Sequence, residues 1–356
     1  MLLRALFLVA ALAFGSAESA LAQGHLSVRG QEIVDPSGKP ILLRGYNWGR
    51  FGKAEQQDGR DNAAQGANAV RIPLRWWGYY KSKGVDSRND TADATADVSP
   101  ENLKILDDTV RWASEAHLWI ILFIDSNCGQ NGTQNEEMIA YCDPGHKYPN
   151  GHNFWSDPEA RAKFIKIWRF VANRYKNTPY IGLFEPLPEP ANVPSITPQQ
   201  IQDFYGEVMG NIRQVAPGIP FLVGGRKYHP DAIEPAFNPT WKDVVYTGNL
   251  FYHPKGNDSG LESIRKRLGD LTSFRSRHNV PVFVQQVGVR GRDDDVSKSK
   301  IKAVLGTLID NRVGFTYWEY RGSTKESEYG VLFRKGKDGW ETDQGAMSAI
   351  SGAFKR

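Results

Sequence analysis

The chain has 356 residues, of which 40% are hydrophobic and 24% charged, a composition typical of folded globular proteins and unlike that of disordered or fibrous ones. Lys and Arg number 44 against 40 Asp and Glu, so the formal net charge at pH 7 is only +4. A charge this small on a chain of this length argues against a nucleic acid partner. The aromatic content of 12% favours instead a ligand with flat, weakly polar faces, such as a sugar.

The first 22 residues have the features of a secretory signal peptide. Arg4 is followed by an apolar run over Leu6–Phe14 and by small residues that end at Ala22. We therefore expect cleavage before Gln23, a single mature domain over residues 23–356, and a secreted or periplasmic protein. The apolar run is shorter than the roughly 20 residues that cross a bilayer, so we expect no membrane span after cleavage. An uncleaved anchor is the alternative.

The two cysteines, Cys128 and Cys142, lie in a segment rich in Gly and Asn. In an oxidising compartment they are expected to form one local disulfide. Without a matching His pair they do not indicate a zinc site, and Asp293–Asp295 lacks the spacing of a calcium loop. Patterns typical of serine esterases, dinucleotide-binding folds and zinc proteases are absent from the sequence. We expect neither a metal nor a cofactor.

Two strand patterns, Leu26–Val34 and Pro40–Tyr46, flank the turn-forming residues Asp35–Lys39 and predict a hairpin. Short apolar runs then alternate with longer helical patterns. The predicted strands are Ile41–Asn47, Ala69–Pro73, Trp119–Asp125, Tyr180–Phe184, Phe221–Gly224, Val244–Leu250, Val282–Gln286 and Gly314–Trp318.

Helical patterns separate most of these strands, over residues 101–116, 157–175, 198–214, 262–278 and 295–311. Continuously apolar strands indicate burial on both faces, and alternation with helices indicates a parallel sheet. Eight such units predict an α/β fold, a single (β/α)8 TIM barrel preceded by a short β-hairpin. In such a barrel the carboxyl ends of all strands meet at one rim, which carries the active site.

Five segments at these strand ends resemble, in order, the strand signatures of glycoside hydrolase family 5, the retaining β-glycanases of the cellulase and mannanase type. The segments are Leu43–Trp48, Gly66–Pro73, Pro188–Pro190, Val282–Gly288 and Tyr317-Trp318. The resemblance covers nearly the whole mature chain. It implies the barrel fold and an activity on a β-linked oligosaccharide or polysaccharide.

In that family a glutamate at the end of the fourth strand protonates the glycosidic oxygen, and a glutamate at the end of the seventh attacks the anomeric carbon. The resemblance gives the first role to Glu189, whereas the position of the second is occupied by Gln286. A carboxamide cannot become an anionic nucleophile. The site therefore departs from the family's retaining machinery.

Three further positions depart from the family pattern. Pro188 replaces the Asn before the acid, Asp125 matches the His of the third strand, and either Asn249 or Leu250 matches the His of the sixth. Four positions keep the family's residue: Arg71, Glu189, Tyr252 and Trp318. An engineered Glu-to-Gln change would explain Gln286 alone, so natural divergence is the favoured explanation.

Asp125 is a candidate catalytic base. A carboxylate there could activate water opposite Glu189 and give inversion if the two groups lie about 6.5–9.5 Å apart. The competing interpretation makes Asp125 a hydrogen-bonding partner of Arg71 or of a nearby turn. Glu185 and Glu319 are two other rim carboxylates that could serve as acid or base.

Polar and aromatic residues at the strand ends are the predicted sugar-binding groups, because pyranose C–H faces stack on aromatic rings. They are Arg71, Trp48, Asn249, Tyr252, Tyr228, Trp318 and Trp76. We therefore expect O-glycosyl hydrolysis of a β-linked glycan with Glu189 as the acid/base. The alternatives are a glycan-binding protein without turnover, because of Gln286, and a transglycosylase.

Overall fold

The computed structural model describes residues 24–49, 51–74, 100–124, 158–188, 197–225, 233–252, 260–289, 295–322, 329–334 and 339–356. Several predicted residues therefore lie outside the described residues: Trp76, Asp125, Cys128, Cys142, Glu189 and Tyr228, together with the predicted signal peptide.

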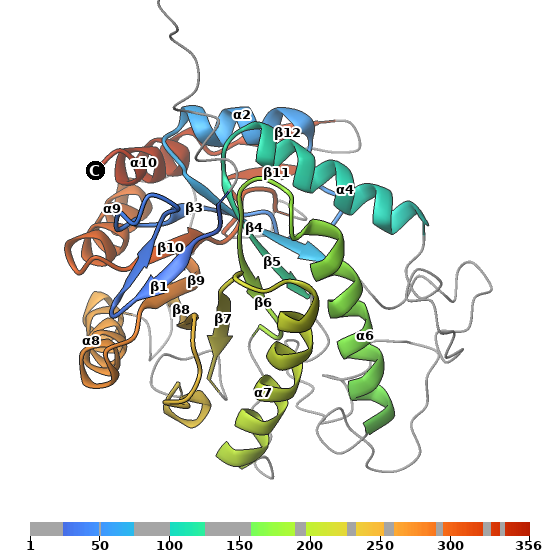
Figure 1. Ribbon diagram of the computed structural model, residues 1–356. Helices are drawn as coiled ribbons and strands as arrows, with labels where there is room; N and C mark the ends of the chain where they lie inside the picture. Colours follow the sequence, from blue (N-terminus) through green and yellow to red (C-terminus); the bar gives the residue numbers. More distant parts are fainter. Residues whose placement is uncertain are drawn as a thin grey trace, which may run out of the picture.

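Eight parallel strands form a closed barrel in which neighbours along the chain pair and the last strand, β10, closes onto the first, β3 (Figure 1). The strands are β3 (Arg44–Asn47), β4 (Ala69–Leu74), β5 (Trp119–Ile124), β6 (Ile181–Glu185), β7 (Phe221–Gly224), β8 (Val244–Tyr252), β9 (Val282–Val289) and β10 (Gly314–Tyr317). The predicted (β/α)8 barrel is confirmed, because all eight predicted runs contribute a barrel strand.

Helices surround the barrel (Figure 1). They are α2 (Gln56–Ala64), α4 (Pro100–Glu115), α6 (Pro158–Tyr175), α7 (Pro198–Val215), α8 (Leu261–His278), α9 (Asp295–Asp310) and α10 (Gln344–Phe354). Helix-start chemistry is visible at α7, where Thr197 and Gln200 form a reciprocal capping box and Pro198 opens the helix. Asp343 caps α10 by accepting a hydrogen bond from the Ala346 N–H. No helix in the described part of the chain is long and apolar enough to cross a membrane.

The amino-terminal hairpin is shorter than predicted and turns at a different place. Strands β1 (Ser27–Arg29) and β2 (Glu32–Val34) pair with each other around Gly30, whose φ is 57°. The predicted turn at Asp35 does form, since its carboxylate accepts hydrogen bonds from the Ser37 and Lys39 N–H groups. Beyond that turn the chain bridges to β2 at Val34–Pro40, where the Ile41 N–H donates to the Ile33 carbonyl, and then enters β3, which pairs within the barrel.

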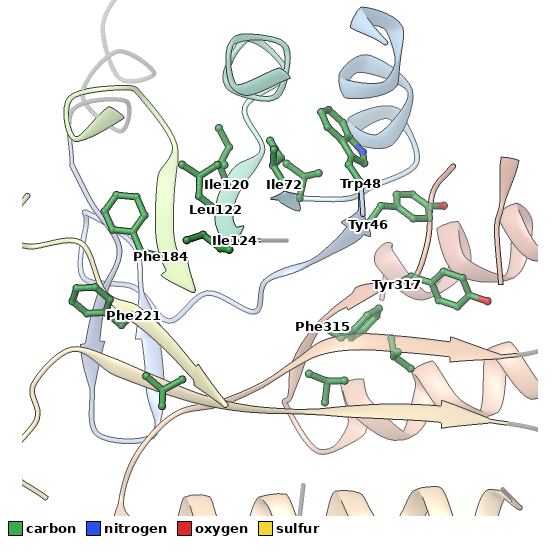
Figure 2. Close-up of a cluster of buried hydrophobic side chains, with 14 of the residues drawn as sticks. Tyr46, Trp48, Ile72, Ile120, Leu122, Ile124, Phe184, Phe221, Phe315 and Tyr317 are labelled. Carbon is green, nitrogen blue, oxygen red and sulfur yellow. The ribbon is translucent and has the colours of Figure 1, made fainter. Parts of the chain in front are cut away.

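Side-chain alternation divides the core into two clusters. Outward-facing strand residues pack under the helices in the larger cluster, which includes Tyr46, Ile72, Ile120, Leu122, Phe184 and Phe315 (Figure 2). Inward-facing residues fill the amino half of the barrel together with two hairpin residues. This inner cluster consists of Leu26, Ile33, Leu43, Ala69, Trp119, Ile121, Leu183, Leu222, Val245 and Phe283. The hairpin thus closes the amino end of the barrel, and the opposite end carries the candidate site.

A small antiparallel sheet, β11 (Leu332–Arg334) with β12 (Trp340–Thr342), follows the barrel. The Gly322 N–H donates to the Leu332 carbonyl, and the Leu332 N–H donates to the Tyr320 carbonyl. The 3-10 turn η3 (Glu234–Ala236) precedes β8. The small sheet therefore braces the segment that leaves β10.

Candidate active site

Toward the carboxyl end of the strands, the buried inward positions become polar. These buried polar residues are Asn47, Arg71, Glu185, Thr247, Asn249, Gln285, Gln286 and Thr316. Polar groups are buried in a protein only where partners or function compensate for their desolvation. The polar layer thus marks the part of the barrel interior suited to chemistry.

Arg71 and Glu185 form a fully buried ion pair across this layer. Arg71 Nε lies 2.5 Å from Glu185 Oε2, and its Nη2 lies 2.9 Å from Oε1, a two-pronged contact. The guanidinium lies 3.5 Å from the centre of the Phe123 ring. Burial raises the pKa of the Glu185 carboxyl, and the charge of Arg71 opposes that rise. Arg71 Nη1 is buried without an acceptor among the described residues.

The sequence had suggested Asp125 as a partner for Arg71, and it had given Glu185 only as a rim carboxylate that could serve as acid or base. The signal that could have found this pair is the period of two along strands. Arg71 falls two residues after the inward-facing Ala69, and Glu185 two residues after the inward-facing Leu183. Glu185 is therefore paired with Arg71 and buried, and it is not exposed to solvent as a free acid.

Gln286 lies next to a β-bulge in β9. Asn249 pairs with Gln286 while Gly248 pairs with Val284, so Gln285 is an extra residue in β9. The register against β10 shifts at the same place. Such a bulge leaves backbone groups outside the ladder and redirects the side chains around it.

Side chains of the neighbouring strands form hydrogen bonds with the backbone groups of Gln285. The Gln285 N–H donates to Thr247 Oγ1 at 3.0 Å. Its carbonyl accepts hydrogen bonds from the Thr316 hydroxyl and, at 3.4 Å, from Asn47 Nδ2. Strands β8, β10 and β3 together hold the bulge, and through it they orient Gln286.

Gln286 is 5% exposed, and its Oε1 accepts a hydrogen bond from Asn249 Nδ2 at 3.4 Å. Of the two residues that could match the sixth-strand His, Asn249 therefore faces Gln286, whereas Leu250 belongs to the outer cluster under the helices. Gln286, at which the sequence resemblance predicts the nucleophile, is thus an amide in contact with another amide and carries no negative charge.

The approach to Glu189 is anchored from two helices. Trp168 in α6 is buried, and its indole N–H donates to the Pro186 carbonyl at 3.0 Å. The Tyr205 hydroxyl in α7 donates to the Leu187 carbonyl at 2.9 Å. These bonds fix the backbone that leads from β6 to Pro188, the last described residue before Glu189.

The predicted aromatic sugar platforms differ in exposure. Trp318 and Tyr252 are partly exposed at the ends of β10 and β8. Trp48 is only 4% exposed, and its indole N–H donates to Asn62 Oδ1 in α2. In this position Trp48 packs beneath the rim, between β3 and α2. The Trp318–Glu319 peptide bond is cis, and the Glu319 side chain is fully buried.

Among the described residues, no three His, Cys, Asp or Glu side chains are grouped as ligands for a metal ion. The described rim offers amide groups for hydrogen bonding, the Arg71 cation and aromatic rings for stacking. The carboxylates proposed for proton transfer, Glu189 and Asp125, lie outside the described residues.

Comparison with known proteins identifies the family. The family model for cellulase (glycosyl hydrolase family 5) matches residues 34–323. An endoglucanase of Paenibacillus polymyxa is 23% identical over 372 residues, which cover 92% of this chain and 86% of that protein. A probable glucan 1,3-beta-glucosidase A of Aspergillus fumigatus is 27% identical over 175 residues, or 48% of this chain and 36% of that protein. The chain thus spans about a third of the length of this fungal relative.

Among solved structures, Cel5A of Thermotoga maritima in complex with cellobiose has the same fold, with a TM-score of 0.64 at 19% identity over 87% of this chain and 97% of that chain. The family match covers most of the sequence and includes every barrel strand. The chain therefore belongs to glycosyl hydrolase family 5, the cellulase family.

Proposed function

We propose that this protein hydrolyses O-glycosyl bonds of a β-linked glycan at the carboxyl end of the barrel, by direct attack of water. Glu189 donates its proton to the glycosidic oxygen as the bond from that oxygen to the anomeric carbon breaks. Asp125 takes a proton from the attacking water as the new carbon–oxygen bond forms. The configuration at the anomeric carbon inverts.

The observation that carries this proposal is the neutral amide pair of Gln286 and Asn249. A covalent glycosyl intermediate needs a carboxylate at the position of Gln286, and an amide cannot supply the anion. Family membership together with Glu189 supports hydrolysis, so the attacking group is water. The buried carboxylate of Glu185 does not replace the missing anion, because it is paired with Arg71.

The chain offers a base from a neighbouring strand. Strands β5 and β6 are paired, with Phe123 opposite Glu185. Asp125 follows Phe123 by two residues, and Glu189 follows Glu185 by four. In the sequence, both carboxyl residues thus follow the carboxyl ends of adjacent strands, which supports their action on one sugar.

The test is a hydrolysis assay with soluble β-1,4- and β-1,3-glucans, mannan and xylan, in which reducing ends are counted and the anomer first released is identified by NMR. We expect the inverted anomer, with rates at least about 100-fold lower in Glu189→Gln and Asp125→Asn, the size typical of losing a general acid or base. Release of the retained anomer, or full activity in either variant, would contradict the proposal.

A second candidate is glycan recognition without turnover, and Gln286 is the observation that favours it. It predicts that the wild type binds one of these glycans, measured by calorimetry, and releases no reducing ends. The variant Gln286→Glu separates the two further. Restored hydrolysis with retention would mean that the site lost only its nucleophile.

We also propose that residues 1–22 are removed on export and that Cys128 and Cys142 form a disulfide in the mature protein. Edman sequencing of the exported protein should begin at Gln23. A thiol assay on the unfolded, unreduced protein should find no free cysteine. A start at Met1 contradicts the first proposal, and two reactive thiols contradict the second.

A further inference from the structure

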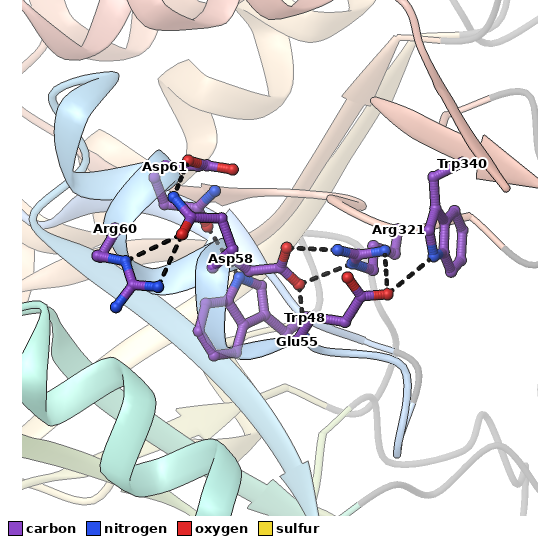
Figure 3. A network of polar contacts seen from close by, with 9 residues as sticks. Trp48, Glu55, Asp58, Arg60, Asp61, Arg321 and Trp340 are labelled. Atoms are coloured by element: carbon purple, nitrogen blue, oxygen red, sulfur yellow. Dashed lines mark hydrogen bonds and ion pairs between the residues drawn. The ribbon is translucent and has the colours of Figure 1, made fainter.

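The segment that follows β10 is held by a cluster of charged side chains around Arg321 (Figure 3). Arg321 Nε lies 2.7 Å from Asp58 Oδ2, and its Nη2 lies 2.6 Å from Asp58 Oδ1. Nη1 donates to Glu55 Oε1 at 3.0 Å. Arg321 is 7% and Asp58 1% exposed, so this contact is sheltered from water, and removing one partner would leave a buried charge unpaired.

The same cluster reaches the small sheet. Trp340 in β12 donates its indole N–H to Glu55 Oε1 at 3.1 Å, and the Arg321 guanidinium lies 4.6 Å from the centre of the Trp340 ring. Backbone bonds add to it, since the Val331 N–H donates to the Glu319 carbonyl and the Tyr320 N–H to the Asn47 carbonyl. The chain immediately after Trp318 is therefore fixed to α2, β3 and the segment that leads into β11.

Gly49 lies directly against the ring of Trp318. A Cβ atom at position 49 would lie 2.2 Å from Cζ3 and 2.4 Å from Cη2 of that ring, well inside van der Waals contact. No side chain larger than hydrogen fits there unless the indole or the backbone moves. Glycine at position 49 thus allows the indole to lie close to the backbone at the end of β3.

The position of Trp318 joins this arrangement to the candidate site. Strand β10 lies between β9 and β3, and the Trp318 N–H donates to the Val287 carbonyl at 2.8 Å, one residue beyond Gln286. The indole is partly exposed, whereas the neighbouring Tyr317, Glu319 and Tyr320 are buried. An aromatic ring at the end of the strand next to β9 is in a position to stack on a sugar bound at this rim.

We propose that Gly49 and the Arg321–Asp58 ion pair are positioning elements that set the angle and depth of the Trp318 ring for sugar stacking. Gly49 provides the space on one side of the ring. The ion pair holds the following backbone so that the ring does not swing outward. This inference deepens the proposed function, because it assumes that the ligand at Trp318 is a glycan.

The first test replaces Gly49 with Ala and uses Gly269→Ala as a matched control. Gly269 lies in α8, where an added Cβ meets nothing within 4 Å. Binding is measured by calorimetry with cellohexaose and with laminarihexaose. We expect Gly49→Ala to weaken binding about tenfold and Gly269→Ala to leave it unchanged, since aromatic stacking is sensitive to ring geometry.

A second readout does not depend on any glycan. The contribution of Trp318 to the near-ultraviolet circular dichroism is the difference between spectra recorded without and with Trp318→Phe, and it is measured in the wild type, in Gly49→Ala and in Gly269→Ala. This difference spectrum should change in Gly49→Ala and should stay as in the wild type in Gly269→Ala. An unchanged spectrum in Gly49→Ala overturns the positioning role. A changed spectrum in a protein that binds neither oligosaccharide supports the positioning role and contradicts the proposed recognition of a β-glucan.

The ion pair is tested with Arg321→Lys and Arg321→Met. Lysine keeps the charge but loses the two-pronged contact with Asp58. We expect the affinity for the oligosaccharide and the Trp318 spectrum to be disturbed most in Arg321→Met and partly restored in Arg321→Lys. If both variants fold and keep the wild-type spectrum and affinity, Arg321 has no positioning role.

Discussion

The two halves of the barrel interior differ in chemistry although the same strands build both. At the amino half the inward positions are Ala69, Leu183, Val245 and Phe283, all apolar. Two residues further along the same strands they become Arg71, Glu185, Thr247 and Gln285. A step of two residues keeps the side of the sheet and changes only the depth.

The comparison shows that the amino half of the barrel interior contributes stability, whereas the carboxyl half carries the polar groups suited to chemistry. The apolar half gains from burial, at roughly 25 cal/mol for each Å² of apolar surface removed from water. The polar half gains little net free energy from its contacts, because each buried polar group first loses its hydration. Contacts within the layer offset part of this cost, as between Glu185 and Arg71 and between Thr247 and the bulge at Gln285.

Breaking the buried ion pair should have the largest effect on stability. Glu185→Gln leaves the Arg71 guanidinium buried without a counter-charge, which typically costs about 3–5 kcal/mol. Urea unfolding followed by circular dichroism at pH 7 measures this loss. A loss below about 1 kcal/mol would show that water reaches Arg71, which would contradict the full burial of the ion pair.

The matching change in the apolar half removes bulk and not charge. Leu183 lies two residues before Glu185 and is fully buried. Leu183→Ala should cost about 2–5 kcal/mol, because it creates a cavity in the inner cluster. The effect should be independent of pH between 5 and 8. A pH-dependent loss in the same urea experiment would mean that the two halves are coupled.

Removing the cation from the pair gives an effect that depends on pH. Burial raises the pKa of the Glu185 carboxyl, and Arg71→Met deletes the group that opposes this rise. A carboxyl whose folded pKa is raised contributes stability below its unfolded pKa, about 4.3, and loses that contribution as the pH rises through the folded value. We therefore expect the deficit of Arg71→Met against the wild type to shrink as the pH falls from 7 to 4.

At most about 1.4 kcal/mol can be regained for each unit of pH, because one proton is involved. Urea unfolding of both proteins at pH 7, 5.5 and 4 checks this. A deficit that stays constant over that range would show that Glu185 remains ionised without its partner.

Much of the fold was predictable because each buried strand appears in the sequence as a short run of apolar residues. Phe221–Gly224 is predicted and observed with the same bounds, and the other barrel strands differ by a few residues at their ends. Helix α2 was not predicted, since Gln56–Ala64 contains few apolar residues and includes Gly59. Gly59 serves a tertiary contact there, because a Cβ would lie 2.6 Å from the Trp112 carbonyl oxygen in α4.

The site was predictable as a set of strand ends but not as a set of contacts. Motif resemblance singled out Arg71 and Gln286, yet the partner of Arg71 depends on which strands face each other across the barrel. The bulge at Gln285 depends on register, which no local pattern in β9 reveals. Similarly, Trp48 has the residue type of a sugar platform, and only its burial against α2 separates it from Trp318.

The smallest expected effect tests the bulge and compares the two halves on a single strand. Thr247→Val removes the acceptor of the buried Gln285 N–H and should cost about 1–3 kcal/mol, since the donor is left without a partner. The reverse change two residues earlier, Val245→Thr, places a hydroxyl in the apolar half and should cost a similar amount. Thermal unfolding measures both losses.

The two variants should nevertheless differ in binding. Only Thr247→Val disturbs the backbone beside Gln286, so only this variant should also weaken oligosaccharide binding. Equal binding by both would mean that Thr247 stabilises the strand without orienting Gln286. Gln286 would then be oriented by Asn249 and by the other contacts of the bulge, those of the Gln285 carbonyl with Thr316 and Asn47.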